Sequence, residues 1–94
     1  MVHIRQKYII SSPKLVEISY ELRLSHRLWE KSMVFPHYVN RVNKLNEIGL
    51  DNLPAVRLHR DSIGRLSVVD GCHRLHIAIT EGRTHIMAEI EEYE

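Results

Sequence analysis

The segment over residues 68–82 constrains the fold more than any other part of the chain, because it places Asp70-Gly71 between two apolar stretches. In a strand, the large apolar residues at every second position of 75–79 would share one face, and Asp70-Gly71 would be a tight turn between two strands. In a helix, the same stretch carries one apolar stripe, and Gly82 stands where helices often end. Both patterns fit. We prefer the helix, because a strand, a glycine turn, a helix and a final strand would bury both apolar faces.

The rest of the chain predicts short strands and flanking helices. Strands are expected over residues 2–10, 53–60, 65–69 and 84–93, and helices over 14–31 and 36–49. Ser12 and Pro13 are expected to cap and begin the first helix, and Pro36 and Gly49 to bound the second. The turn at 61–64 makes the two middle strands a β-hairpin.

The length of 94 residues supports a single domain with one modest core, so any site is expected to be a surface groove. No apolar run reaches the roughly 20 residues that span a bilayer, and residues 1–10 lack the apolar stretch of a secretion signal. We therefore expect a cytoplasmic protein with no membrane partner. The single cysteine, Cys72, excludes an intrachain disulfide and fits a reducing compartment.

Charge is distributed unevenly along the chain. Residues 1–60 carry ten Lys and Arg against five Asp and Glu, whereas residues 61–94 carry three against seven. The basic part can attract phosphate-bearing partners, with Arg41 and Lys44 on the polar side of the second helix, although ordinary solvated helix faces produce the same split more often.

The seven histidines are scattered, and only His73 and His76 share a helical spacing. The chain has no His-Glu-x-x-His and no Cys-x-x-Cys motif. The sequence therefore predicts no metal site.

The start of the 72–81 helix carries the chemistry that the sequence favours. Its first main-chain amides have no partner within the helix and lie at the positive end of the helix dipole. Gly71 lets the backbone approach a phosphate, Arg74 supplies a planar fork of donors, and His73 supplies a second donor. We therefore predict a phosphate-binding turn formed by Gly71, Cys72, His73 and Arg74.

The same turn makes Cys72 a candidate nucleophile, because a helix N-terminus and nearby cations favour the thiolate and lower its pKa. Asp70 is a candidate proton acceptor or Mg²⁺ ligand, and Arg57 or His59 can reach the groove from the preceding strand. In the alternative reading, Cys72 is a small residue packed at a strand-to-helix elbow, and Arg74 pairs with a carboxylate such as Asp70.

The run Val68-Val69-Asp70-Gly71-Cys72-His73-Arg74-Leu75, with Gly82 and the apolar strand over 86–90, resembles the signature of the ParB/sulfiredoxin superfamily. The resemblance covers residues 53–90. Gly-Cys-His-Arg is close to the sulfiredoxin pattern, whereas the Asp before it and the Leu after it are closer to ParB-type domains. The resemblance implies a small single α+β domain over residues 1–94, with a short mixed sheet, a hairpin, flanking helices and a nucleotide-phosphate site at residues 71–74.

We expect a nucleotide-phosphate-binding domain, an NTP hydrolase or phosphotransferase that uses ATP or CTP with Mg²⁺. Three alternatives stay open. One is a DNA-binding protein or nuclease that uses the basic residues. Another is an ATP-dependent sulfinic acid reductase with Cys72 as the nucleophile, as the resemblance implies. The last is a non-enzymatic, phage-type protein that inhibits a host protein partner, for which exposure of Trp29, Phe35 or Tyr38 would be favourable.

Overall fold

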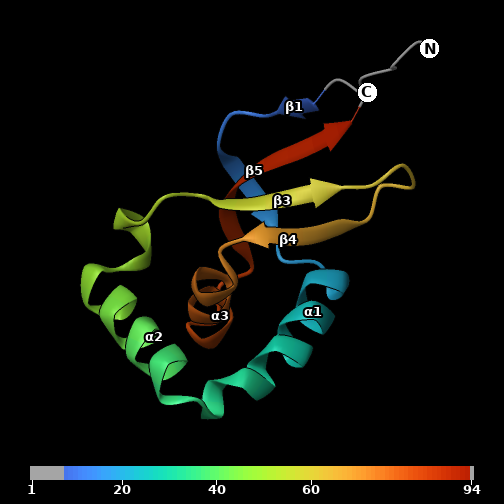
Figure 1. Ribbon diagram of the computed structural model, residues 1–94. Helices are drawn as coiled ribbons and strands as arrows, with labels where there is room; N and C mark the ends of the chain where they lie inside the picture. The colour runs from blue at the N-terminus through green and yellow to red at the C-terminus, as the bar shows by residue number, and fades with distance from the viewer. Residues whose placement is uncertain (1–7, 94) are drawn as a thin grey trace, which may run out of the picture.

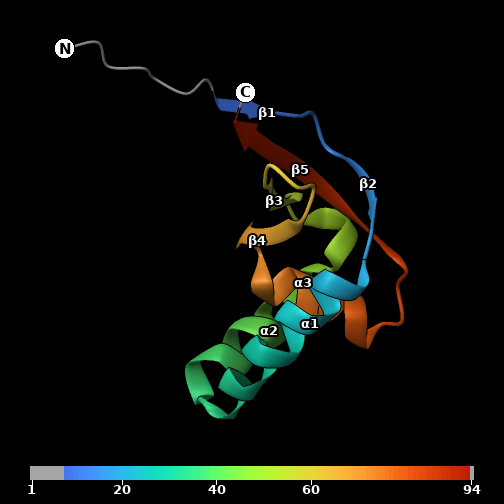
Figure 2. The same cartoon turned by 90° about the vertical axis from the view of Figure 1, so that its right-hand side faces the viewer.

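Within the part of the chain that the structure describes, a mixed five-stranded sheet forms one layer of the fold, and three α-helices lie on one side of it (Figures 1 and 2). The computed structural model describes residues 8–93. The strands are β1 (Tyr8–Ile10), β2 (Lys14–Glu17), β3 (Val56–Arg60), β4 (Leu66–Asp70) and β5 (His85–Tyr93). The helices are α1 (Tyr20–Glu30), α2 (Pro36–Ile48) and α3 (Cys72–Thr80), with short 3₁₀ helices at Lys31–Val34 and Leu50–Asn52. This architecture confirms the predicted α+β class for the described residues.

The sheet order is β1-β5-β3-β4, with β2 also paired to β5. β3 and β5 are parallel, and the other pairs are antiparallel. The β3–β4 hairpin, α2, α3 and β5 confirm the predicted elements within a few residues. Of the strand expected over residues 2–10, the structure describes only β1, and residues 2–7 lie outside the described part of the chain.

The prediction of a helix from residue 14 is wrong, because Lys14–Glu17 forms β2 and pairs with the first half of β5. The strand is interrupted between β1 and β2 at Ser11, whose hydroxyl accepts a hydrogen bond from the Ile90 amide at 2.9 Å. Ser12-Pro13 is thus a break between two strands. Helix α1 starts at Tyr20, six residues after the predicted start at residue 14, where the Ser19 side chain accepts a hydrogen bond from the Leu22 amide and caps the helix.

The core lies between the sheet and α3. It contains Ile18, Leu22, Val56, Leu58, Leu75, Ala78, Ile86, Ala88 and Ile90. Two leucines of the segment expected to form the first helix lie outside the core: Leu15 is 68% exposed on β2 and Leu28 is 72% exposed on α1. The strand pairing of residues 14–17 places Leu15 out of helical phase with the buried Ile18 and Leu22.

Helix α3 occupies the centre of the helical layer. It packs on β3 and β5, and α1 and α2 contact it from either side (Figure 1). This arrangement brings the side chains of α1 and α2 to the first turn of α3, where the sequence predicted the site. No helix within the described residues is long and apolar enough to cross a bilayer.

Candidate functional site

Gly71 makes the turn from β4 into α3. Its φ of 113° and ψ of 25° lie in the left-handed region, and a Cβ at this position would lie 2.7 Å from Val56 Cγ1. A side chain is excluded here both by the backbone conformation and by the lack of space. The first amides of any α-helix, here those of Cys72 and His73, have no partner within the helix, and no side chain among the described residues caps α3. The predicted strand-turn-helix is confirmed.

Arg74 braces this turn. Its Nη1 donates hydrogen bonds to the carbonyl oxygens of Pro54 at 2.6 Å and Ala55 at 2.8 Å, and its Nη2 donates to Asp70 Oδ2 at 3.2 Å. Only 13% of the side chain is exposed. The expectation that Arg74 offers a free fork to phosphate is at odds with these bonds, because both protons of Nη1 already have acceptors. The structure favours the alternative in which Arg74 pairs with Asp70.

A groove runs between α2 and the first turn of α3. One hollow of about 210 Å³ includes Arg41, Asp70, Gly71 and His73 in its lining. A second, of about 510 Å³, is lined by His37, Tyr38, Asn40, Arg41, Lys44 and His73. The two share Arg41 and His73, so they form one continuous surface, which we call the α2–α3 groove. The groove brings together the basic residues of α2 and the predicted turn, and the sequence alone does not indicate that these two features lie close in space.

Aromatic rings pack against His73, which lines this groove. The Tyr38 ring is stacked on His73 with ring centroids 5.5 Å apart, and the Trp29 ring meets His73 edge-on at 4.9 Å. His73 Nε2 is buried and has no hydrogen-bond partner among residues 8–93. Burial lowers the pKa of His73, and the positive charge of Arg41 lowers it further. His73 is therefore a neutral ring at neutral pH. Of the three aromatic residues considered from the sequence, Phe35 is 53% exposed, whereas Trp29 and Tyr38 are half-buried.

Cys72 lies on a different side of the turn. It lines a hollow of about 160 Å³ together with His26, Trp29 and Leu75, and it is absent from the lining of the α2–α3 groove. Burial raises the pKa of the Cys72 thiol, and the charge of Asp70 raises it further. The expectation of a lowered pKa is wrong, because burial and the charge of Asp70 outweigh main-chain hydrogen bonding, which lowers the pKa. Cys72 is therefore a protonated thiol at neutral pH.

Arg57 and His59 do not reach the groove. They alternate along β3 with the buried Val56 and Leu58, so their side chains lie on the sheet face away from the helices. There Arg57 Nη2 pairs with Glu89 Oε2 at 3.1 Å, and His59 Nδ1 lies 3.6 Å from Glu91 Oε1. The phosphate-binding role predicted for Arg57 has no support from this geometry, because the sheet separates it from the turn.

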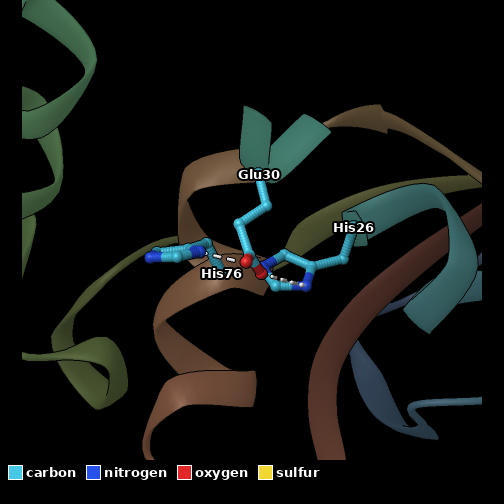
Figure 3. A group of neighbouring side chains, drawn as sticks. All are labelled: His26, Glu30 and His76. Atoms are coloured by element: carbon cyan, nitrogen blue, oxygen red, sulfur yellow. Dashed lines mark hydrogen bonds and ion pairs between the residues drawn. The ribbon is translucent and has the colours of Figure 1, made fainter. Parts of the chain in front are cut away.

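A cluster missed by the sequence lies between α1 and α3. His26 Nε2 and His76 Nδ1 are 2.8 Å apart, and Glu30 Oε2 lies 3.6 Å from His26 Nδ1 (Figure 3). Burial lowers the pKa of His26, and His76 lowers it further, against the opposing effect of Glu30. The His26–Glu30 spacing is a helical i,i+4 pair that the sequence displays. His76 is 50 residues away, and only the packing of α1 on α3 brings it to that pair.

No known protein family, no curated protein and no solved structure matches the chain.

Proposed function

We propose that the protein binds the phosphates of a nucleoside triphosphate, ATP or CTP, in the α2–α3 groove. The observation that carries this proposal is the convergence of uncapped main-chain amides at the start of α3 with Arg41 and Lys44 of α2. A helix N-terminus attracts anions through its amides and its dipole, and flanking cations add attraction. Both basic residues are exposed and so can reorient toward a ligand.

The groove also offers a place for the cation and the base of a nucleotide. Asp70 is at the end of β4, with 78% of its side chain exposed, and its carboxylate can hold Mg²⁺ beside the phosphates. His37 and Tyr38, whose ring centroids are 4.2 Å apart, present aromatic surface on which a base can stack. Because Arg74 is hydrogen-bonded to the backbone, we expect Arg41, Lys44 and the main-chain amides to neutralise the charge of the phosphates.

The resemblance of residues 53–90 to the ParB/sulfiredoxin superfamily supports the same site, because the superfamily carries its nucleotide-phosphate turn at the positions of Gly71 to Arg74. An NTP hydrolase or phosphotransferase would use this site to stabilise phosphate charge, with Asp70 holding Mg²⁺ or accepting a proton. A sulfinic acid reductase is less well supported, because the Cys72 thiol is protonated and lines another hollow.

The proposal is tested by calorimetric titration of the protein with MgATP, MgCTP and inorganic triphosphate. We expect saturable one-to-one binding that Arg41→Ala and Lys44→Ala each weaken by about tenfold, because each removes one charge-assisted contact. Arg65→Ala is the matched control, since Arg65 is exposed on the hairpin loop and outside the groove. Its affinity should equal that of the unmodified protein.

Absence of affinity for every nucleotide and for triphosphate would remove the proposal, as would affinity that neither α2 substitution changes. A parallel titration with a short DNA duplex separates the nucleic-acid alternative. Duplex binding that weakens steeply with salt and depends on Arg41 and Lys44, with no nucleotide binding, would assign the groove to DNA backbone phosphates instead.

A further inference from the structure

The cluster of His26, Glu30 and His76 has the composition of a metal site. Two imidazoles and one carboxylate lie together between α1 and α3, and one donor atom from each lies within 4.8 Å of the other two. Figure 3 shows the Glu30 carboxylate beside the point where the two rings meet. This set of ligand types suits zinc and the neighbouring transition metals.

The distance between the two imidazole nitrogens is close to what a tetrahedral ion requires. Zinc takes nitrogen and carboxylate oxygen at about 2.0–2.2 Å, which places two tetrahedral donor atoms about 3.3 Å apart. The His26–His76 contact of 2.8 Å would open slightly as the ion takes the place of the shared proton, which moves to the far nitrogen of its own ring. Glu30 Oε2 lies 3.6 Å from His26 Nδ1, so the carboxylate would have to move toward the nitrogens that face the ion; 56% of its side chain is exposed, which leaves it free to do so.

The surroundings hold the two imidazoles in place. His26 is only 5% exposed, and the Trp29 ring lies 5.6 Å from the His76 ring, centroid to centroid. Each imidazole can stay neutral, with its proton on the nitrogen that does not face the ion. Burial of one ligand and exposure of another is the arrangement of a site that is anchored on its inner side and open to water on its outer side.

We propose that His26, Glu30 and His76 bind a divalent transition-metal ion, zinc first among them, and leave a fourth position for water or another small ligand. The ion would join α1 to α3 on the side of α3 that carries Cys72. The site uses none of the residues proposed to bind phosphate, so a test of metal binding does not depend on whether the protein binds a nucleotide.

The test uses the full chain, treated with a chelator and dialysed, and titrates it with Zn²⁺ by calorimetry. Trp29 is the single tryptophan, so Ni²⁺ or Cu²⁺ bound beside His76 should also quench its fluorescence. We expect one saturable site. Glu30→Gln should weaken it at least tenfold, and His76→Asn should weaken it further, since loss even of a residue that only orients a ligand costs about 10- to 100-fold.

Matched control variants distinguish the loss of a metal ligand from poor folding of a variant. Glu21→Gln alters an exposed carboxylate at the other end of α1, and His85→Asn removes an exposed histidine on β5; both should bind Zn²⁺ as the unmodified protein does. Glu30→Gln changes an exposed side chain, and circular dichroism verifies its fold. Cys72→Ser should also bind unchanged, because the sulfur is not among the donor atoms that meet.

Three results would overturn the site as proposed. The first is the absence of saturable binding of Zn²⁺, Ni²⁺ and Cu²⁺. The second is binding that Glu30→Gln and His76→Asn leave unchanged, which would place the ion elsewhere. The third is loss of binding in Cys72→Ser, which would put the thiolate in the ligand set and contradict the three-residue site.

Discussion

Substitution of Gly71 by alanine tests the turn on which the phosphate site depends. Alanine in the left-handed region costs about 1–2 kcal/mol relative to glycine. At Gly71 the new methyl would also lie 2.7 Å from Val56 Cγ1 and 2.9 Å from Val56 Cβ, too close for any real contact. Val56 is fully packed in the core, so relief of this overlap should cost a further 1–3 kcal/mol, roughly the usual penalty of overpacking. We expect a total loss of about 2–5 kcal/mol.

Gly64→Ala is the matched control for this measurement. Gly64 has a φ of 87°, and a Cβ added there would meet no atom within 4 Å, so its substitution carries only the backbone cost of about 1–2 kcal/mol. Urea unfolding of both variants, followed by circular dichroism, gives the two free energies of unfolding. Equal losses at the two glycines would refute the reasoning, because the close approach of β3 to the turn would then have no energetic consequence.

Buried and paired side chains lead to three more expectations. The pKa values of His26 and His73 are lowered in the folded protein, so below pH 6.5 the unfolded chain takes up protons that the folded protein does not. The free energy of unfolding should therefore fall as the pH is lowered from about 6.5 to 5. Urea unfolding across this range measures it, and a free energy that does not change with pH would contradict the expectation. Alkylation of Cys72 with iodoacetamide at about pH 8 should be slower than that of free cysteine, and an equal or faster rate would show that burial does not control the thiol. Arg74→Lys should lower the free energy of unfolding in urea by about 1–3 kcal/mol, because a single ammonium cannot replace the bonds to two carbonyls and a carboxylate. Arg57→Gln should lower it by less than about 1 kcal/mol. Equal losses in the two variants would show that the Arg74 hydrogen bonds do not stabilise the turn.

The elements that the sequence predicted well are those whose local signals agree with their tertiary surroundings. Pro36 and Gly49 bound α2, and Gly71 precedes α3, as their backbone preferences require. The predicted start of the first helix was wrong because Lys14–Glu17 has no local sequence signal that distinguishes a helix from an edge strand. Its pairing with β5, which lies near the other end of the chain, decides the matter.

The candidate site was predicted in outline but not in its contacts. The uncapped turn at Gly71 follows from a glycine between a strand and a helix. The commitment of Arg74 to the carbonyls of Pro54 and Ala55 depends on where the loop before β3 lies, which spacing does not reveal. The raised pKa of Cys72 likewise reflects burial by α1 packing, and the meeting of His26 with His76 depends on two helices far apart in sequence.

The most direct test of phosphate binding at the turn is an amide chemical-shift titration of ¹⁵N-labelled protein with MgATP and MgCTP. We predict that the largest saturable shifts occur at the amides of Cys72 and His73, with Arg41 on α2 moving in step, because these groups surround the proposed phosphates. Shifts confined to the outer sheet face around Arg57 and His59, or no shifts with either nucleotide, would contradict the account.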